Sequence, residues 1–200
     1  MTDLFETRAK DWDANERRTK LASAIGSSIL QHVQLHERMT VLDFGAGTGL
    51  ITGQIAPLVN RTVAIDTSQA MLDKLESKPE LKDRVETICQ DLVDDPLDAR
   101  FDLIVSAMAL HHVENTSKLI ARFSEQLNDS GVVALADLDK EDGSFHPADT
   151  EGVFHFGFDR AELRTILESK GFRQVEFFTA HTIKGEEKDY PIFLLTARKA

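Results

Sequence analysis

The feature that most constrains the fold is a regular alternation of short apolar, β-branched runs with segments of helical spacing. Strands that alternate with helices predict a parallel sheet, because each crossover helix returns the chain to begin the next strand in the same direction. Helices then cover both faces, and ligands bind beyond the carboxyl ends of the strands. The five runs predicted as strands are Thr40 to Phe44, Thr62 to Ile65, Arg84 to Cys89, Phe101 to Ser106 and Val132 to Ala136.

The two ends of the chain add elements outside this alternation. Before the first strand, apolar residues recur every four positions from Asn15 to Val33, which predicts an amphipathic helix. Near the C-terminus, Asp159 to Gly171 carries the start and stop signals of another helix. Two strand-like runs, Gln174 to Ile183 and Pro191 to Ala197, follow with no helix between them. We therefore expect an antiparallel hairpin on an otherwise parallel, doubly wound α/β sheet.

Composition limits the classes of protein that fit. With 42% hydrophobic and 28% charged residues and no apolar run of membrane-helix length, the chain predicts one soluble domain without a membrane partner. The net charge of -11 argues against nucleic acid, and the one basic cluster, Arg17, Arg18 and Lys20, fits a solvated helix face. Residues 1–10 lack an apolar signal core and Cys89 is the single cysteine, so we expect a cytoplasmic protein with this thiol in the core.

The first predicted strand leads into a glycine turn, Gly45-Ala46-Gly47-Thr48-Gly49, and a helical pattern resumes from Leu50 to Val59. Glycine adopts backbone angles that other residues resist, and its missing side chain lets a ligand approach the backbone. A dinucleotide fingerprint would need glycine in place of Leu50, and a P-loop would need a following Gly-Lys pair. Asp66 ends the next strand, where a carboxylate can accept hydrogen bonds from both hydroxyls of an adenosine ribose.

These residues resemble the motifs of the class I S-adenosylmethionine-dependent methyltransferases. The first motif of that family looks like Val41 to Gly49, the second like Asp66 to Leu72, and the third like Gln90-Asp91-Leu92 after a strand. Phe101 to Ser106, followed by Ala109 to Val113, is similar to the fourth-strand segment of the family.

The resemblance covers residues 40–200 and implies a Rossmann-like, seven-stranded sheet that forms the catalytic domain. Residues 1–39 would be an N-terminal helical segment or lid of the same single domain. The implied cofactor is S-adenosylmethionine, with S-adenosylhomocysteine as the product, and Asp43 would lie near the methionine amine. The cofactor-binding residues that the resemblance implies are Asp43, Gly45, Ala46, Gly47, Gly49, Asp66, Thr67, Met71, Asp91, Leu92 and Ser106.

Histidines in two predicted loops are the candidates for a general base. A hydroxyl, thiol or amine acceptor must lose a proton, and a histidine with a pKa of about 6.5 is suited to take it. His111 and His112 follow the fourth strand, whereas His146 and His155 lie in the irregular stretch from Leu138 to Phe158. The alternative roles for the histidines are turn capping and exposure to solvent. For the aromatic residues, the alternative is packing of the loop or of the first helix. The predicted catalytic residues are His111, His146 and His155, and the predicted acceptor-binding residues are Trp12, His112 and Phe154.

The expected function is methyl transfer to a small-molecule acceptor, with oxygen, nitrogen, sulfur or carbon as the attacked atom. The alternatives are a methyltransferase acting on RNA or protein, and a non-catalytic protein that binds S-adenosylmethionine or S-adenosylhomocysteine. An NAD-dependent dehydrogenase fits less well, because its third glycine and a Tyr-x-x-x-Lys pair are missing. The sequence indicates no oligomeric state. No metal site is predicted either, because the possible ligands have no diagnostic spacing; they are Asp137, Asp139, Asp142, His146 and His155.

Overall fold

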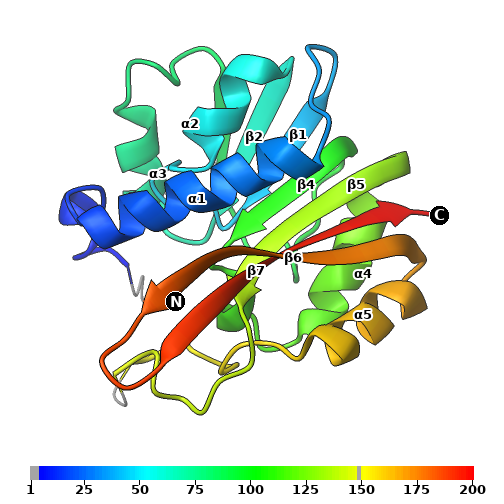
Figure 1. Cartoon of the computed structure of the whole chain (residues 1–200). Coiled ribbons are helices and arrows are strands. Elements are labelled where there is room, and N and C mark those ends of the chain that lie inside the picture. Colours follow the sequence, from blue (N-terminus) through cyan, green and yellow to red (C-terminus); the bar gives the residue numbers. More distant parts are fainter. Residues whose placement is uncertain (1–4, 148–149) are drawn as a thin grey trace.

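Across residues 5–147 and 150–200, the part of the chain that the computed structural model describes, seven strands form one sheet (Figure 1). In chain order they are β1 (Thr40–Phe44), β2 (Arg61–Asp66), β3 (Val85–Cys89), β4 (Phe101–Ala107), β5 (Leu127–Leu138), β6 (Phe172–Lys184) and β7 (Asp189–Lys199). Their spatial order is β3-β2-β1-β4-β5-β7-β6. Strands β1 to β5 pair in parallel, whereas β7 runs antiparallel to both β5 and β6. The predicted doubly wound, mostly parallel sheet with a C-terminal antiparallel hairpin is confirmed.

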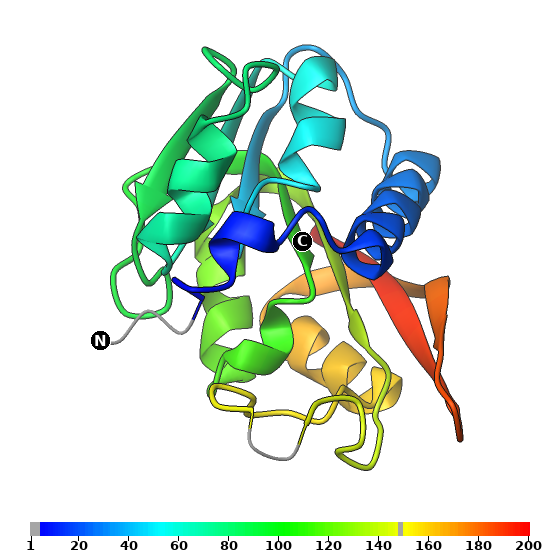
Figure 2. The same ribbon diagram turned by 90° about the vertical axis from the view of Figure 1, so that its left-hand side faces the viewer.

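Helices cover both faces of this sheet (Figure 2). One face carries α1 (Glu16–His32), α2 (Thr52–Ile55) and α3 (Gln69–Glu76), and the other carries α4 (Thr116–Gln126) and α5 (Arg160–Ser169). Short 3-10 turns lie at η1 (Ala9–Asp11), η2 (Ala56–Leu58) and η3 (Leu110–His112). Within the described residues, no helix has the length and apolar character needed to cross a membrane.

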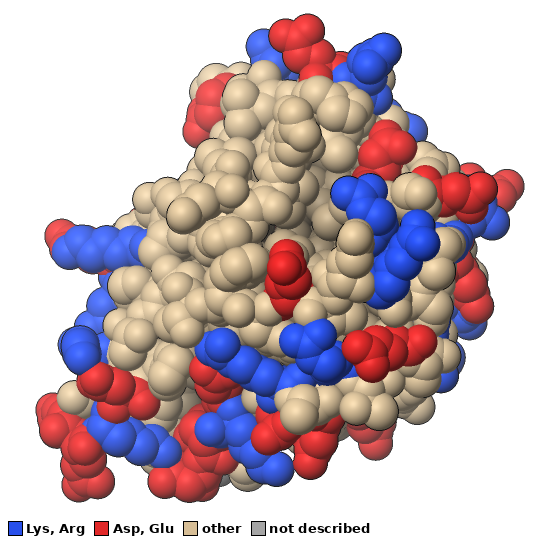
Figure 3. Space-filling model, turned by 45° about the vertical axis from the view of Figure 1, so that its right-hand side comes forward, with Lys and Arg blue, Asp and Glu red and all other residues tan. Residues whose placement is uncertain are grey.

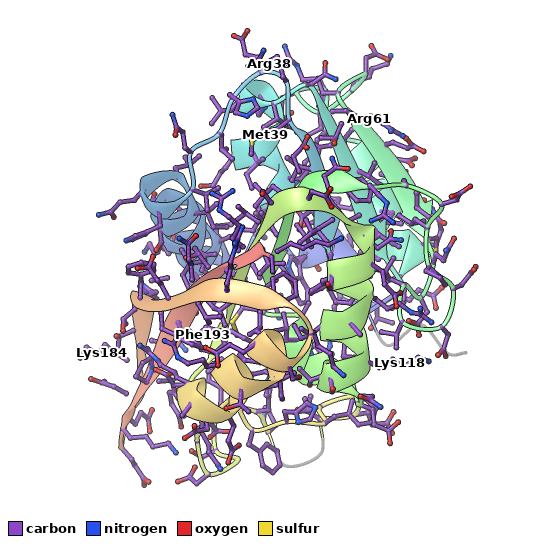
Figure 4. All side chains as sticks on the ribbon, turned by 90° about the vertical axis from the view of Figure 1, so that its right-hand side faces the viewer. Arg38, Met39, Arg61, Lys118, Lys184 and Phe193 are labelled. Carbon is purple, nitrogen blue, oxygen red and sulfur yellow. The ribbon has the colours of Figure 1, made fainter. Side chains whose placement is uncertain are left out.

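Successive residues of a central strand are buried on opposite faces. Val41 lies in the core shared with Ile25 of α1, whereas Leu42 lies in the core shared with α4 and α5. Phe193 of β7, labelled in Figure 4, belongs to this second core. Its ring centroid lies 5.6 Å from that of Phe177 on β6. Each fully buried side chain of this size contributes about 1.5–3 kcal/mol. Burial on both faces explains why the strands are almost continuously apolar.

The helix boundaries follow their sequence signals. The Asn15 side chain accepts hydrogen bonds from two backbone N–H groups at the start of α1, and Asp159 does the same at the start of α5. Gly171 follows α5 with φ of +85°, a conformation that favours glycine at a helix end. Both predicted helices are confirmed.

Two predictions are wrong in detail. The helix expected from Leu50 to Val59 is α-helical only over Thr52–Ile55 and then tightens into η2, because Pro57 has no N–H to continue the helical hydrogen bonds. Cys89, expected in the core, is exposed, because it ends β3 and β3 is an edge strand of the sheet.

Candidate active site

The glycine turn follows β1 at the edge where the parallel strands end. Gly45, Gly47 and Gly49 have φ values of +66°, +53° and +79°. A Cβ atom on Gly45 would lie 2.4 Å from that of Ala109, and one on Gly49 would lie 2.7 Å from Cγ of Leu75, so both glycines pack against neighbours. A Cβ on Gly47 would meet no described atom within 4 Å. The backbone of Gly47 therefore faces open space, a cradle in which a ligand can approach the chain.

Asp66 holds the glycine turn to the neighbouring strand. At the end of β2, its Oδ2 accepts a hydrogen bond from the N–H of Gly47 at 2.8 Å, and its Oδ1 accepts one from the N–H of Ser68 at 2.9 Å. The N–H of Ala46 donates to a β2 carbonyl at 3.1 Å. Ser68, and not Asp66, is the N-cap of α3, since its Oγ accepts from the N–H of Met71. The Asp66 carboxylate thus borders the cradle, where the resemblance places the ribose.

Asp43 is a carboxylate buried two residues before the turn. It is 1% exposed, and its Oδ2 accepts a hydrogen bond from the hydroxyl of Thr52 at 2.6 Å. Burial raises the pKa of Asp43 to about 7, with a further rise from the charge of Asp66, although hydrogen bonds from Thr52 oppose both effects. A positively charged group bound beside it would favour the ionised carboxylate. Asp43, Asp66 and the open backbone of Gly47 therefore fit a cofactor that carries an ammonium group and a ribose.

The other predicted cofactor residues lie along the same edge of the sheet. Thr67 and Asp91 are exposed after the ends of β2 and β3, whereas Met71, Leu92 and Ser106 are buried. The hydroxyl of Ser106 donates to a β1 carbonyl at 2.9 Å and ties β4 to β1. Met71, Leu92 and Ser106 therefore pack inside the protein beneath the strand ends.

Three histidine rings, those of His111, His112 and His146, form a histidine cluster beside this edge. The ring centroids of His111 and His112 lie 4.1 Å apart, and that of His146 lies 5.2 Å from the first and 6.2 Å from the second. Ala109, whose Cβ borders Gly45, comes two residues before His111. The cluster therefore adjoins the glycine cradle and unites two predicted catalytic residues with one predicted acceptor-binding residue.

His111 pairs with a residue that the sequence offered only as a possible metal ligand. His111 is 2% exposed, its Nδ1 lies 2.7 Å from Oδ1 of Asp137, and its backbone N–H donates to Oδ2 at 3.2 Å. Asp137 is fully buried on β5. A carboxylate only accepts, so Nδ1 carries the proton and Nε2 of the neutral ring is an acceptor. Among the described residues, neither Nε2 of His111 nor Nε2 of His146 has a hydrogen-bond partner, although both atoms are buried.

The surroundings of His112 and His146 lower the pKa of each ring and so favour its neutral form. Burial lowers the pKa of His112 to about 4, and the proximity of His111 lowers it further. Burial also lowers the pKa of His146, again with a contribution from His111. His112 donates from Nδ1 to the carbonyl of Gly152 at 2.6 Å, because a carbonyl can only accept.

The N-terminal segment lies over the histidine cluster. The ring of Phe5 meets that of His112 edge-on at a centroid distance of 5.5 Å and that of Trp12 at 5.9 Å. Figure 2 shows this segment passing across the strand ends between α3 and α4. Phe5 links the predicted acceptor-binding residue Trp12 to the cluster, and residues 1–4 of the predicted lid lie outside the described residues.

Asp13 fastens this segment to the cradle, a contact that the sequence did not reveal. Its Oδ1 accepts a hydrogen bond from the hydroxyl of Thr48 at 2.5 Å, and its Oδ2 pairs with Nζ of Lys78 at 2.7 Å. Thr48 belongs to the glycine turn and is 1% exposed. The N-terminal segment and the glycine turn are therefore directly connected.

Two predicted site residues contact the histidine cluster only through their backbone in the hydrogen bonds found, because the N–H groups of Phe154 and His155 donate to the carbonyl of His111 at 2.9 Å and 3.3 Å. The side chain of Phe154 is 54% exposed, and Nε2 of His155 donates to the carbonyl of Val113 at 2.9 Å. Both residues line a surface groove of about 860 Å³ between the start of α4, the loop before α5 and α5 itself. The structure gives His155 a contact that holds this loop to the segment before α4.

The possible metal ligands are dispersed. Within residues 5–147 and 150–200, no group of three or more His, Cys, Asp or Glu side chains is arranged to hold a metal ion. Asp139 pairs with Arg160, and Asp142 pairs with Lys188.

Sheet order, glycine cradle and strand-end carboxylates together define the class of protein as a methyltransferase. Residues 41–131 match the family model described as a methyltransferase domain. An uncharacterized methyltransferase of Bacillus licheniformis is 30% identical over 191 residues, which cover 84% of this chain and 88% of that protein. An uncharacterized methyltransferase of Schizosaccharomyces pombe is 32% identical over 135 residues, which cover 60% of this chain and about half, 48%, of that protein. The chain belongs to the class I S-adenosylmethionine-dependent methyltransferase family.

Solved structures support the fold. The protein in the structure of a DhpI–SAH complex has 22% sequence identity to this chain, and its fold matches with a TM-score of 0.77. The match covers 99% of this chain and 95% of that chain. The N-methyltransferase NodS from Bradyrhizobium japonicum, solved with S-adenosylhomocysteine, is 16% identical with a TM-score of 0.73 and a match over 99% of each chain. The similarity extends over the N-terminal segment as well as the sheet.

Proposed function

We propose that this methyltransferase acts on a small-molecule acceptor bound at the histidine cluster and uses S-adenosylmethionine as the methyl donor. The observation that carries the proposal is that the buried Nε2 atoms of His111 and His146, beside the glycine cradle, have no hydrogen-bond partner among the described residues. A buried polar atom without a partner costs about 1–3 kcal/mol, which a bound ligand can recover by donating a hydrogen bond. These atoms therefore favour an acceptor that carries hydrogen-bond donors.

The residues of the cradle have separate roles in this proposal. Asp66 accepts hydrogen bonds from the ribose, Asp43 faces the ammonium group, and the backbone of Gly47 lies along the ligand. The cofactor supplies a methyl group on a positively charged sulfur, already activated for displacement. Because that activation is built in, the protein contributes chiefly by positioning the acceptor and excluding water.

The cover over the histidine cluster and the charge of the chain favour a small acceptor over RNA. Phe5 lies against His112, so the acceptor must fit beneath an aromatic side chain. An RNA substrate would need a concentrated basic face to offset the net charge of -11. On the face drawn in Figure 3, Lys and Arg lie interspersed with Asp and Glu.

Calorimetric titration with S-adenosylmethionine, S-adenosylhomocysteine and NAD tests the cofactor site. We expect binding of the two adenosyl ligands in the micromolar range, about -8 kcal/mol, and none of NAD. Incubation with methyl-labelled S-adenosylmethionine and a panel of small phenols, amines, thiols and carboxylic acids then tests the acceptor class. Label in a small compound supports the proposal, and label only in added RNA or protein would overturn it.

Gly47→Ala should abolish binding of the adenosyl ligands. The added methyl group would project into the open space that the cofactor occupies, because nothing else lies within 4 Å. Gly171→Ala is the matched control, since Gly171 also has a positive φ and an equally open Cβ position but follows α5. Both variants should lose about 1–2 kcal/mol of stability from backbone strain. Equal calorimetric affinity in the two variants would contradict the cradle.

A further inference from the structure

The buried contact between His111 and Asp137 indicates how the proposed reaction proceeds, and the inference drawn from it rests on the proposed function. We infer that His111 is the general base for an acceptor hydroxyl of the phenol type and that Asp137 is its positioning residue. The two residues come from different strand ends, η3 after β4 and the end of β5, which the parallel pairing of these strands brings together.

Asp137 fixes both the orientation and the tautomer of the His111 ring. One carboxylate oxygen lies 2.7 Å from Nδ1, and the other accepts the backbone N–H of His111 at 3.2 Å. Oδ1 also accepts the N–H of Leu138 at 2.7 Å, which holds the carboxylate itself in place. The proton of the neutral ring therefore stays on Nδ1, and the basic lone pair is on Nε2, the atom without a partner among the described residues.

The groups around the His111 ring are compatible with a base that takes up one proton in each methyl transfer. His112 faces His111 from η3 and His146 faces it from the loop after β5, while the charges of Glu141 and Arg8 act on His146. The neutral forms of His112 and His146, which their surroundings favour, do not repel the imidazolium that forms. Asp137 stabilises that imidazolium directly.

A general base of this kind is needed most by a hydroxyl acceptor. A thiol, with a pKa of about 8.5, already supplies thiolate near neutral pH, and a neutral amine attacks through its nitrogen lone pair and loses a proton only after the transfer. A phenolic hydroxyl, with a pKa of about 10, is still protonated at pH 7 but within reach of an imidazole. The rings of Phe5 and Phe145, which contact His112 and His146 of the cluster, suit a flat aromatic acceptor.

The step balances without any further reactant. The acceptor O–H bond breaks and its proton goes to Nε2 of His111, while the acceptor oxygen forms a bond with the methyl carbon. The electron pair of the breaking carbon–sulfur bond stays on sulfur. The imidazolium, paired with Asp137, later releases its proton to water.

Imidazole nitrogen shifts of the histidine-labelled protein test the pair without any acceptor. Loss of one signal set in His111→Gln assigns the ring. In the unmodified protein at pH 7.5 we expect the Nδ1–H tautomer, and in Asp137→Asn a mixture or the reverse tautomer. Asp102→Asn is the matched control, because that carboxylate accepts the N–H of Thr40 at 2.8 Å at the opposite end of β4. An Nε2–H tautomer in the unmodified protein would overturn the inference.

Methyl transfer from S-adenosylmethionine to the compound panel tests the acceptor class and the pH profile. We expect label in the phenols, and a kcat about 10²–10⁴-fold lower in His111→Gln and Asp137→Asn with cofactor affinity unchanged. In His111→Gln the residual rate should rise with pH up to the pKa of the phenol itself. If Asp137→Asn does not fold, His111→Gln carries this comparison alone.

The outcomes separate the two levels of the hypothesis. Methylation confined to amines, thiols or carboxylic acids would overturn the inference and leave the proposed function intact. Methylation confined to RNA or protein would overturn both, since the inference rests on a small acceptor. An unchanged rate and pH profile in both variants would show that the pair is merely structural.

Discussion

At the scale of single residues, Asp43, which we propose to face the ammonium group of the cofactor, is a buried carboxylate that lowers the stability of the folded protein when it is ionised. Burial raises its pKa from 3.8 to about 7. An acid whose pKa is higher in the folded state favours folding below its unfolded value and loses that advantage as the pH rises through the folded value. Between pH 3.8 and about 7, Asp43 therefore makes the free energy of unfolding progressively smaller.

Asp43→Asn should stabilise the cofactor-free protein by about 2–4 kcal/mol at pH 8 and by much less at pH 4. The amide oxygen can still accept the Thr52 hydroxyl, so the hydrogen bond survives while the buried charge disappears. Binding of S-adenosylmethionine should weaken roughly 10- to 150-fold, because a charge-assisted hydrogen bond is lost. Urea unfolding at the two pH values checks the first effect and calorimetry the second. A stability difference independent of pH would refute this account of Asp43.

Whether a residue of the candidate site could be predicted depends on how far away its partner lies in the sequence. Asp43 and Gly47 could be predicted because they belong to one contiguous motif. The pairing of His111 with Asp137 joins residues 26 positions apart, and only the parallel pairing of β4 and β5 brings them into contact. The only sign of this pair in the sequence was that Asp137, a polar residue, directly follows the apolar run of β5. Its position alone does not show that His111 is its partner.

At the scale of elements, the Asp13 contacts connect the N-terminal segment to the glycine turn. Asp13→Ala should detach this segment, lower the stability by about 1–2 kcal/mol and accelerate amide exchange in η1, because two partly buried contacts disappear. Trp12 is the only tryptophan, so its fluorescence reports on the segment alone. Glu16→Ala is the control, since its pair with Lys20 is 83% and 74% exposed and contributes at most about 0.5 kcal/mol. Equal exchange in both variants would argue against Asp13 as the anchor.

The elements that could be predicted are those whose periodicity is long and uninterrupted. The spacing of apolar residues sufficed for α1, and the change from alternating helices to two adjacent runs sufficed for the β6–β7 hairpin. The helix after the glycine turn was over-extended, because the same apolar pattern continues past Pro57. Exposure of Cys89 depends on the position of β3 at the sheet edge, which strand order alone decides.

At the scale of the whole molecule, different parts of the chain form the C-terminal core and the glycine cradle. Phe193 is fully buried on β7, and its ring lies within 6.4 Å of that of Phe158 and 5.6 Å of that of Phe177, so it joins three parts of the C-terminal third. None of these residues borders the glycine cradle. Damage to this core should therefore lower the fraction of folded protein without altering the cofactor affinity of the molecules that remain folded.

Phe193→Ala should destabilise the protein by about 3–5 kcal/mol, because it removes a buried ring and leaves a cavity. That loss is a large part of the roughly 5–15 kcal/mol that holds a domain of this kind together. Phe156→Ala is the matched control: the Phe156 side chain is 54% exposed, so its removal should cost less than about 1 kcal/mol. Urea unfolding gives both values, and calorimetry below the unfolding transition should give the same affinity for S-adenosylhomocysteine in both variants. A weakened affinity in folded Phe193→Ala would mean that the C-terminal core also shapes the cofactor site.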